Sequence, residues 1–234
     1  FKYNEFLVIS DGCTAKAGTI TSNYQRFSDW KKVNENDAVT ENMETHTTLF
    51  YGMFPKERLL DLILNYIMYN DDHKILPQYH QYFGVEKAIK STMTRGKQTG
   101  KAGILWHTQG SGKSFSMVFY AANMIKILKN PTIVVVTDRN DLDNQLYSTF
   151  LNSMEFLKQT PVQADDRKML TEILKDRQKG GIFFTTLQKF QDGTGLFSNR
   201  NDILVLVDEC HRSHYGIDPV IKIDTDTSMA YKKF

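Results

Sequence analysis

The stretch GILWHTQGSGKSFSMVFYAANMIKIL, residues 103–128, decides the fold. Its first four residues, GILW, form an apolar run that predicts a short strand over 103–106. The glycine-rich segment HTQGSGKS (107–114) follows, and a helical pattern then extends from Lys113 to about Leu128. A strand that enters a glycine-rich loop ending in Gly-Lys-Ser, followed at once by a helix, is the context that a phosphate-binding loop requires.

The chemistry of this loop depends on two glycines and a lysine. Gly110 and Gly112 let the backbone curl closely around an anion, and N–H groups at the start of the helix then point at it. Lys113 should reach the β- and γ-phosphates of a nucleotide, and the hydroxyl of Ser114 should bind Mg²⁺. The general pattern has a glycine where this chain has His107, and a chance turn before a helix is the alternative. The predicted nucleotide-binding residues of the loop are Gln109, Gly110, Ser111, Gly112, Lys113 and Ser114.

Strand-like and helical patterns alternate after this loop. The strand-like runs are rich in Val, Ile, Leu and Phe without polar alternation, as expected for strands buried on both faces. Such alternation predicts an α/β fold, in which a parallel sheet is flanked by helices through right-handed crossovers. The predicted elements are strand Thr132–Val136, helix Asn140–Phe150, helix Asp166–Arg177, strand Gly181–Thr185 and strand Ile203–Val207.

The last of these strands ends in two carboxylates, in the sequence ILVLVDECH (203–211). Asp208 should bind Mg²⁺ through water, and Glu209 should orient and polarise the water that attacks the γ-phosphorus. With Lys113 they form the predicted catalytic set, and a strand that ends in a solvated Asp-Glu pair is the plain alternative. The tetrad DECH resembles motif II of superfamily 2 helicase-type motors. That resemblance assigns His211 to coupling with nucleic-acid movement in preference to zinc binding.

A small α+β region precedes the α/β domain, and the strand–helix alternation itself starts at Ala102. Pro55 suits the first position of a helix because its missing N–H would be unpaired there. Asn70-Asp71-Asp72 should end that helix. The other predicted elements are strands 6–10 (FLVIS) and 18–21 (GTIT), a polar connector over 31–48, a helix from Tyr79 to Thr92 and a flexible basic loop Ser91–Lys101, in which Arg95, Lys97 and Lys101 could touch DNA.

Composition narrows the class of protein further. The 234 residues include 29 Lys+Arg and 27 Asp+Glu, a net charge of +2, so bulk charge does not support nucleic-acid binding. Cys13 and Cys210 form no CxxC pair, so neither a disulfide framework nor a zinc site is indicated. No apolar run reaches the ~18 residues of a membrane span. The chain starts without Met or a signal-peptide pattern, so we expect a cytoplasmic protein or a piece of one.

With these motifs in place, the sequence resembles the restriction (motor and nuclease) subunit of type I restriction–modification enzymes. The resemblance spans nearly the whole chain, and the leading His of HTQGSGKS is usual in that family. Cys210 departs from it, because most members have Ala at this place in DEAH. The strings that carry the resemblance are NEFLVISDG (4–12), KAGTIT (16–21), YHQYFGVEKAI (79–89), ILWHTQGSGKS (104–114), IVVVTDRNDLDNQL (133–146), FLKQTPVQA (156–164), FFTTLQKF (183–190) and DECHRSHYG (208–216).

The resemblance implies how the chain is divided. Residues 1–50 would be the C-terminal tail of a nuclease domain and a connector, 51–75 a linker helix, and 76–234 the first RecA-like ATPase domain. The Glu-x-Lys pair of the family's nuclease centre does not occur in this sequence, and neither do the next motor motif and the second RecA-like domain with its arginine finger. We therefore expect the chain alone to bind ATP weakly at most and neither to translocate nor to cut DNA.

The resemblance also implies roles for residues outside the two ATPase motifs. Gln81 corresponds to the glutamine that recognises adenine, since an amide offers a donor and an acceptor to the base edge. A surface Gln on a helix is an equal alternative. Further residues would contact DNA phosphates, although Asp138 or Asn140 could also cap the next helix. The predicted DNA-binding residues are Thr137, Asp138, Arg139, Asn140, Thr185, Thr186 and Gln188.

The function that the resemblance implies is that of a type I site-specific deoxyribonuclease subunit. The full protein would hydrolyse ATP, with Mg²⁺, to translocate double-stranded DNA and then cleave it, in a complex with specificity and methyltransferase subunits and without a membrane. Two alternatives stay open. One is another superfamily 2 ATPase, such as a repair helicase or a chromatin-remodeller-like protein. The other is a non-motor P-loop protein, such as a kinase or a degenerate nucleotide-binding scaffold.

Overall fold

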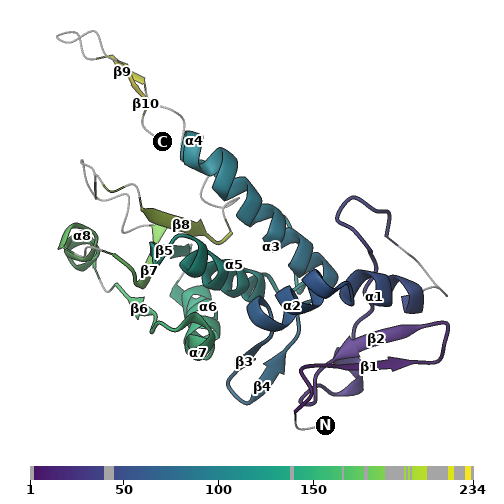
Figure 1. Cartoon of the computed structure of the whole chain (residues 1–234). Coiled ribbons are helices and arrows are strands. Elements are labelled where there is room, and N and C mark those ends of the chain that lie inside the picture. The colour runs from purple at the N-terminus through teal and green to yellow at the C-terminus, as the bar shows by residue number, and fades with distance from the viewer. Residues whose placement is uncertain are drawn as a thin grey trace.

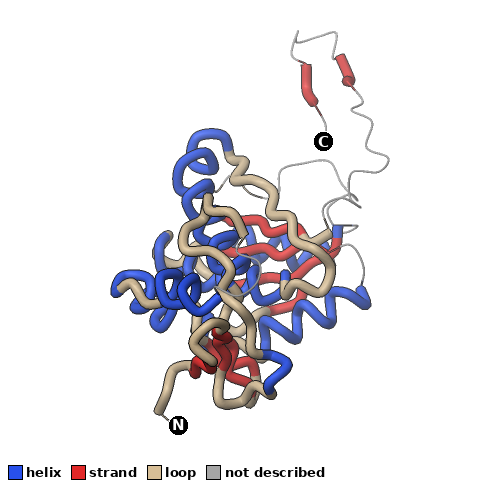
Figure 2. Tube along the Cα trace, turned by 90° about the vertical axis from the view of Figure 1, so that its right-hand side faces the viewer, coloured by secondary structure: helices blue, strands red, loops and turns tan. Residues whose placement is uncertain are grey.

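The computed structural model shows an α/β body with a small N-terminal unit of strands and helices against one side of it (Figure 1). Figure 2 shows the strands of the main sheet lying side by side, with helices on both sides of them. The structure describes residues 3–39, 45–137, 140–164, 166–176, 179–187, 198, 200, 202–209, 221–223 and 230–232, with only the backbone described for 140–144, 176, 221–223 and 230–232.

The main sheet has four parallel strands in the order β6-β7-β5-β8. Its central strands, β5 and β7, are buried at every residue, as their uninterrupted apolar runs predict. β8 lies at an edge and is only partly buried, with Val205 51% and Val207 44% exposed. The predicted parallel α/β sheet is confirmed. The strand bounds are β5 Thr132–Thr137, β6 Val162–Gln163, β7 Ile182–Thr186 and β8 Ile203–Val207.

Helices cover both faces of this sheet because successive residues of β5 point to opposite sides. Ile133 and Val135 belong to the larger hydrophobic core, together with side chains of α5 and α6. Val134 and Val136 belong to a second core, to which α8 contributes two buried leucines. The helices predicted after the glycine-rich loop are thus confirmed to within a few residues. Their bounds are α5 Lys113–Ile127, α6 Asn140–Leu151, α7 Met154–Leu157 and α8 Arg167–Asp176.

The N-terminal unit shares the larger core with the α/β body. Trp30 and Leu49 pack in the same cluster as Tyr82 of α3 and the buried side of α5. The amide of Asn70 also donates to the hydroxyl of Ser153 at 2.8 Å, which fastens the β3–β4 hairpin to the start of α7. The elements are β1 Leu7–Ser10, β2 Ala15–Gly18, the 3-10 turn η1 Tyr24–Arg26, α1 Thr45–Met53, α2 Lys56–Asn65, β3 Met68–Asn70, β4 His73–Ile75 and α3 Tyr79–Ser91.

Residues 103–106 do not form the predicted strand. They run as coil, with Ile104 81% and Trp106 85% exposed. A strand forms only when a neighbouring strand satisfies its backbone hydrogen bonds. Within the described ranges, no strand pairs with this segment or with the outer edge of β8. The residues of this apolar run favour a strand, but the described structure has no neighbouring strand for them to pair with.

The predicted flexible loop Ser91–Lys101 is also wrong. α3 continues into a π-helical turn, η2 (Thr92–Gly96), and then into α4 (Lys97–Thr99), so that together they form one long rod (Figure 1). The hydroxyls of Thr92 and Thr94 donate to carbonyl groups four residues earlier, each at 2.8 Å, which supports the continuation.

Boundaries in the N-terminal unit differ from the predictions for local reasons. The predicted strand 18–21 is wrong: β2 ends at Gly18, and the chain then turns, with the N–H of Ser22 donating to the carbonyl of Thr19 at 3.0 Å. The polar connector is shorter than predicted, since α1 already begins at Thr45.

The helix predicted from Pro55 ends at Asn65, and the Asn70–Asp72 segment lies in the turn of the β3–β4 hairpin instead, with Asp71 at φ 55°. Neither this hairpin nor α7 and β6 was predicted. β9 (Ile221–Ile223) pairs antiparallel with β10 (Ala230–Lys232). No helix in the described ranges is long and apolar enough to cross a membrane.

Candidate active site

The phosphate loop has the curled backbone that its glycines predict. Gly110 has φ 77°, and Gly112, which precedes the first residue of α5, has φ 77° and ψ 35°. Between them, the backbone N–H and the hydroxyl of Ser111 both donate to the carbonyl of Thr108, at 3.3 and 2.7 Å. A tight turn therefore leads directly into the first residue of α5. This arrangement presents backbone N–H groups to an anion.

The structure brings the lysine of this loop to the acidic end of β8. Lys113 Nζ lies 3.5 Å from Glu209 Oε1, with side chains 37% and 23% exposed. Glu209 has a left-handed backbone, φ 50°, a conformation that costs free energy for a residue other than glycine and is enriched at functional sites. Its N–H donates to Asp208 Oδ1 at 2.9 Å, while the N–H of Asp208 donates to Val136 at the end of β5.

The oxygen atoms of Ser114 and Asp208 are of the kinds that bind Mg²⁺ together with a nucleotide. Ser114, one residue beyond Lys113 on α5, is partly buried and supplies a hydroxyl oxygen. Asp208 supplies carboxylate oxygens, which Mg²⁺ prefers in combination with water and phosphate oxygens. Glycines, lysine, hydroxyl and carboxylates are thus assembled from two segments far apart in the sequence. The catalytic roles of Lys113, Asp208 and Glu209 stay predictions.

Gln81 is buried, only 5% exposed, and fixes the start of α3 to the phosphate loop. Its Oε1 accepts from the N–H of Gln78 at 2.8 Å, and its Nε2 donates to the carbonyl of Gly112 at 3.0 Å. A side chain added at Gly112 would begin 2.5 Å from that Nε2. The alternative of a plain surface glutamine is therefore wrong, and adenine recognition by Gln81 stays a prediction.

Two histidines, to which the sequence analysis gave no role, contact the phosphate loop on the side where α3 and Gln81 lie. His80 Nε2 lies 3.1 Å from the carbonyl oxygen of Ser111, and its ring meets that of His107 edge-on at 5.1 Å. His107 rests against Gly84 of α3, where an added side chain would lie 3.2 Å from its ring. Burial, with smaller contributions from His80 and Lys113, lowers the pKa of His107. The signal for this contact was His107 itself, at a position where the general motif has glycine.

The predicted DNA-binding threonines lie on the same edge of the sheet but are enclosed. Thr137, Thr185 and Thr186 are 1%, 0% and 3% exposed at the carboxyl ends of β5 and β7. The hydroxyls of Thr137 and Thr185 have no hydrogen-bond partner in the described structure. DNA contact by these residues stays a prediction. Of the other predicted residues, Asp138, Arg139, Gln188 and His211 fall outside the described residues, and only the backbone of Asn140 is described, at the start of α6.

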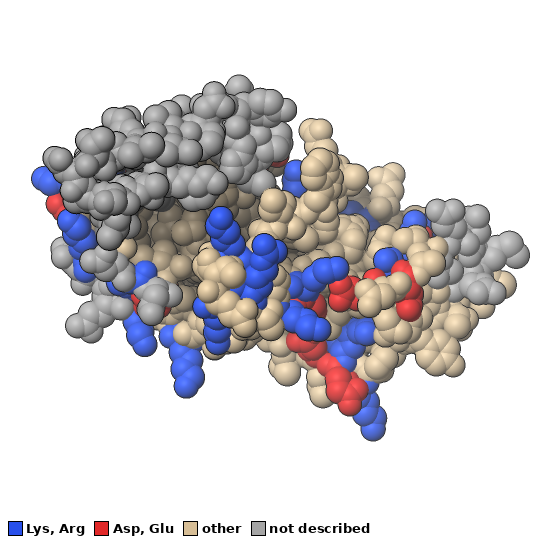
Figure 3. Space-filling model, turned by 90° about the horizontal axis from the view of Figure 1, so that it is seen from above, with Lys and Arg blue, Asp and Glu red and all other residues tan. Residues whose placement is uncertain are grey.

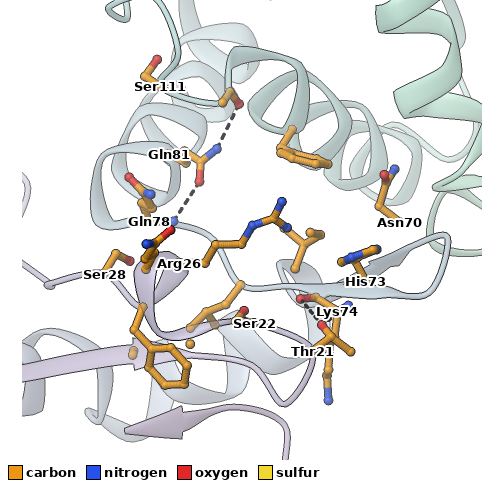
Figure 4. Close-up of a pocket in the computed structure, with 18 of the residues that line it drawn as sticks. Thr21, Ser22, Arg26, Ser28, Asn70, His73, Lys74, Gln78, Gln81 and Ser111 are labelled. Atoms are coloured by element: carbon orange, nitrogen blue, oxygen red, sulfur yellow. Dashed lines mark hydrogen bonds between the residues drawn. The ribbon is translucent and has the colours of Figure 1, made fainter. Parts of the chain in front are cut away.

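A cavity of about 590 Å³ lies beside the phosphate loop (Figure 4). Gly110, Ser111 and Gly112 form one wall, and residues of η1 and the β3–β4 hairpin form the wall opposite. The N-terminal unit thus contributes to the candidate site. Sequence patterns could not indicate this, because the two walls are distant in the chain.

On the face shown in Figure 3, Lys and Arg side chains stand singly or in small groups, several of them beside acidic side chains. This agrees with the near-neutral net charge of +2.

Residues 80–232 match the model of the SWI2/SNF2 ATPase family. This chain belongs to that family. The matched segment begins within α3 and includes the phosphate loop, the Lys113–Glu209 pair and the DECH tetrad. The SWI2/SNF2 match agrees with the resemblance of DECH to superfamily 2 motors and disfavours the kinase alternative.

Type I restriction enzyme subunits are among the similar curated proteins. The HindI endonuclease subunit of Haemophilus influenzae is 43% identical over 92% of this chain. A Methanocaldococcus jannaschii protein, provisionally named as the MjaIXP endonuclease subunit of a type I restriction enzyme, is 34% identical over 92% of it. The chain spans 22% and 23% of the lengths of these two proteins. The resemblance to this group of subunits is confirmed.

Proposed function

We propose that this SWI2/SNF2 ATPase segment is the ATP-hydrolysing motor part of a type I restriction endonuclease subunit. The observation that carries the proposal is the contact between Lys113 of the curled phosphate loop and Glu209 at the end of β8. It places the cation that would bind phosphate beside the carboxylate that would activate water. The similarity to type I restriction subunits supports restriction over the other reactions that ATP-driven motors perform.

The geometry suggests how the residues divide the reaction. When a triphosphate enters the loop, Lys113 would transfer from Glu209 to the β- and γ-phosphates, whose charge exceeds that of one carboxylate. Glu209 would then be free to accept a hydrogen bond from the attacking water and to align it. Ser114 and Asp208 would hold Mg²⁺, which neutralises charge that develops on the phosphate oxygens.

Movement and cleavage of DNA are proposed for the complete protein. Double-stranded DNA would be the track, and specificity and methyltransferase subunits the partners, in the cytoplasm. Residues 76–234 would be the RecA-like motor domain, 1–50 the tail of a nuclease domain and 51–75 the linker. Because the N-terminal unit shares the larger core with α3 and α5, we expect these parts to fold as one body.

The test is Lys113→Ala in the full-length protein, assembled with its partner subunits. We expect DNA-stimulated ATP hydrolysis, translocation and restriction to be lost. Lys87→Ala is the matched control, because Lys87 is 71% exposed and pairs with Glu35 on the surface, where ion pairs contribute little. Unchanged ATP hydrolysis in Lys113→Ala would contradict the assignment of the loop. ATP-driven translocation without any DNA cleavage would favour another SWI2/SNF2 motor over a restriction subunit.

A further inference from the structure

The cavity beside the phosphate loop has a composition that suits the uncharged part of a nucleotide. Among its described lining residues there is no Asp or Glu, and of its two cationic side chains, Arg26 and Lys74, Lys74 is already paired with Glu5 at 2.8 Å. Phe115, the residue after Ser114 on α5, and the aliphatic side chains of Ile75 and Leu76 give it apolar surface, and the amides of Gln78 and Gln81 give it polar groups. A volume of about 590 Å³ is within the usual range for small-molecule sites, roughly 300–1,000 Å³.

Position decides which part of a nucleotide the cavity would take. It opens directly beside Gly110, Ser111 and Gly112, which in the proposed function hold the phosphates. A triphosphate fixed in the loop leaves its sugar and base attached at one end of the phosphate chain. The cavity is a half-open space next to the loop into which that end can extend.

Arg26 is a residue of the N-terminal unit whose side chain extends into this space. It belongs to η1, it is exposed, and Figure 4 shows its side chain extending into the cavity below Gln81 and Ser111. Among the described residues no hydrogen bond or ion pair engages its guanidinium. A planar guanidinium can stack on a flat ring and donate several hydrogen bonds at its rim, which an ammonium cannot. It is therefore an available group for a base or a ribose.

The wall that carries Arg26 is held in place by buried contacts. Thr19 Oγ1 donates to the carbonyl of Lys74 at 2.7 Å, which ties the turn after β2 to β4. Phe27, the residue after Arg26, is buried against Gly18. A wall fixed in this way can position a ligand group without a large ordering cost.

We propose that Arg26, from the unit preceding the motor domain, binds the nucleoside of the bound nucleotide in this cavity through its planar guanidinium. The inference rests on the proposed function, since it assumes that the loop binds the phosphates. It goes further by giving the N-terminal unit a direct contact with the nucleotide. The N-terminal unit, which carries Arg26, would then change its contacts when a nucleotide binds to the motor domain.

The experiment measures binding of two probes to the full-length protein, ATP and inorganic tripolyphosphate, each with Mg²⁺. We expect Arg26→Ala to weaken ATP binding about tenfold, as for loss of a hydrogen-bonded charged group, and to leave tripolyphosphate binding within about twofold. Arg26→Lys should show most of the same loss, because it keeps the charge but not the plane. Arg95→Ala, an exposed arginine of η2 that does not line the cavity, is the control and should change neither.

Several outcomes would overturn the proposal. Equal weakening of both probes by Arg26→Ala would make Arg26 a phosphate ligand, and full ATP affinity in Arg26→Ala or Arg26→Lys would remove its role in recognising the nucleoside. Lys113→Ala separates this proposal from the proposed function, because it should weaken both probes. If Lys113→Ala binds both probes normally, the loop assignment itself has failed. Matching unfolding midpoints for the Arg26 variants and the parent protein show that the fold is kept.

Discussion

Two groups of polar residues lie at the same edge of the same parallel sheet, yet the structure treats them differently. Glu209, after β8, is partly exposed and pairs with Lys113 of the phosphate loop. Thr137 and Thr185, at the ends of β5 and β7, are enclosed, and their hydroxyls have no partner in the described structure. The Lys113–Glu209 side, where we propose that a nucleotide binds, already has its two side chains in contact, and we call it the assembled side. The threonine side, which we call the enclosed side, would have to be uncovered before it could bind DNA.

The largest effect on nucleotide affinity should follow from a substitution that fills space in the phosphate loop. Gly112→Ala adds a carbon 2.5 Å from Gln81 Nε2 at φ 77°, so both the packing and the backbone oppose it. We expect ATP affinity to fall more than tenfold, measured by titration calorimetry. Gly100→Ala is the control, because its φ is 71° but an added carbon meets nothing within 4 Å. Equal affinities in the two variants would show that Gly112 is not part of the binding loop.

A substitution of Gln81 tests whether the proposed nucleotide site includes a contact with the adenine base. We expect Gln81→Ala to reduce the preference for ATP over GTP about tenfold, because an amide reads the adenine edge through one donor and one acceptor. The readout is the ratio of dissociation constants for the two nucleotides. A fall in affinity that is the same for both would mean that Gln81 acts only by holding the carbonyl of Gly112.

Thr185 probes the enclosed side. Thr185→Val removes a buried hydroxyl that has no partner, so we expect the free energy of unfolding to rise by about 1 kcal/mol in urea denaturation. If the residue also contacts DNA when uncovered, DNA-stimulated ATP hydrolysis should fall while basal hydrolysis is kept. A stabilised variant with full DNA stimulation would contradict the DNA-binding role predicted from the sequence and leave a structural threonine.

The smallest effect concerns His107. Burial lowers its pKa in the folded protein, so the folded state binds fewer protons than the unfolded state below the ordinary histidine pKa of about 6.5. Its contribution to stability is complete above that pH and is lost as the pH falls through the folded-state pKa. We expect the melting temperature of the parent protein to drop about 1 °C more than that of His107→Gln between pH 7.5 and 5.5. Parallel profiles would contradict this expectation.

Local patterns predicted the parts of the fold that depend on short segments. The phosphate loop, α5, β5 and β8 follow from glycine placement and apolar runs, and Lys113 and Glu209, each singled out by its motif, lie in contact. The same reasoning failed for residues 103–106, because a strand depends on a neighbour that no local pattern reveals.

Local sequence patterns likewise could not predict contacts between segments that lie far apart in the chain. His80 reaches the loop only because α3 lies along α5, and Arg26 reaches the cavity only because the N-terminal unit packs beside both. The link between Gln78 and Gln81 was readable in principle, since a Gln at the third helical position often bonds back to the residue before the helix.

The central claim is that the Lys113–Glu209 contact marks a site of ATP hydrolysis. Single-turnover hydrolysis of radiolabelled ATP by Glu209→Gln in the full-length protein, with DNA present, tests it most directly. The substitution keeps the size of the side chain and removes the carboxylate that would align water. We predict ATP binding within about twofold of the parent protein and hydrolysis at least about a hundredfold slower. Hydrolysis at the parental rate would contradict the claim.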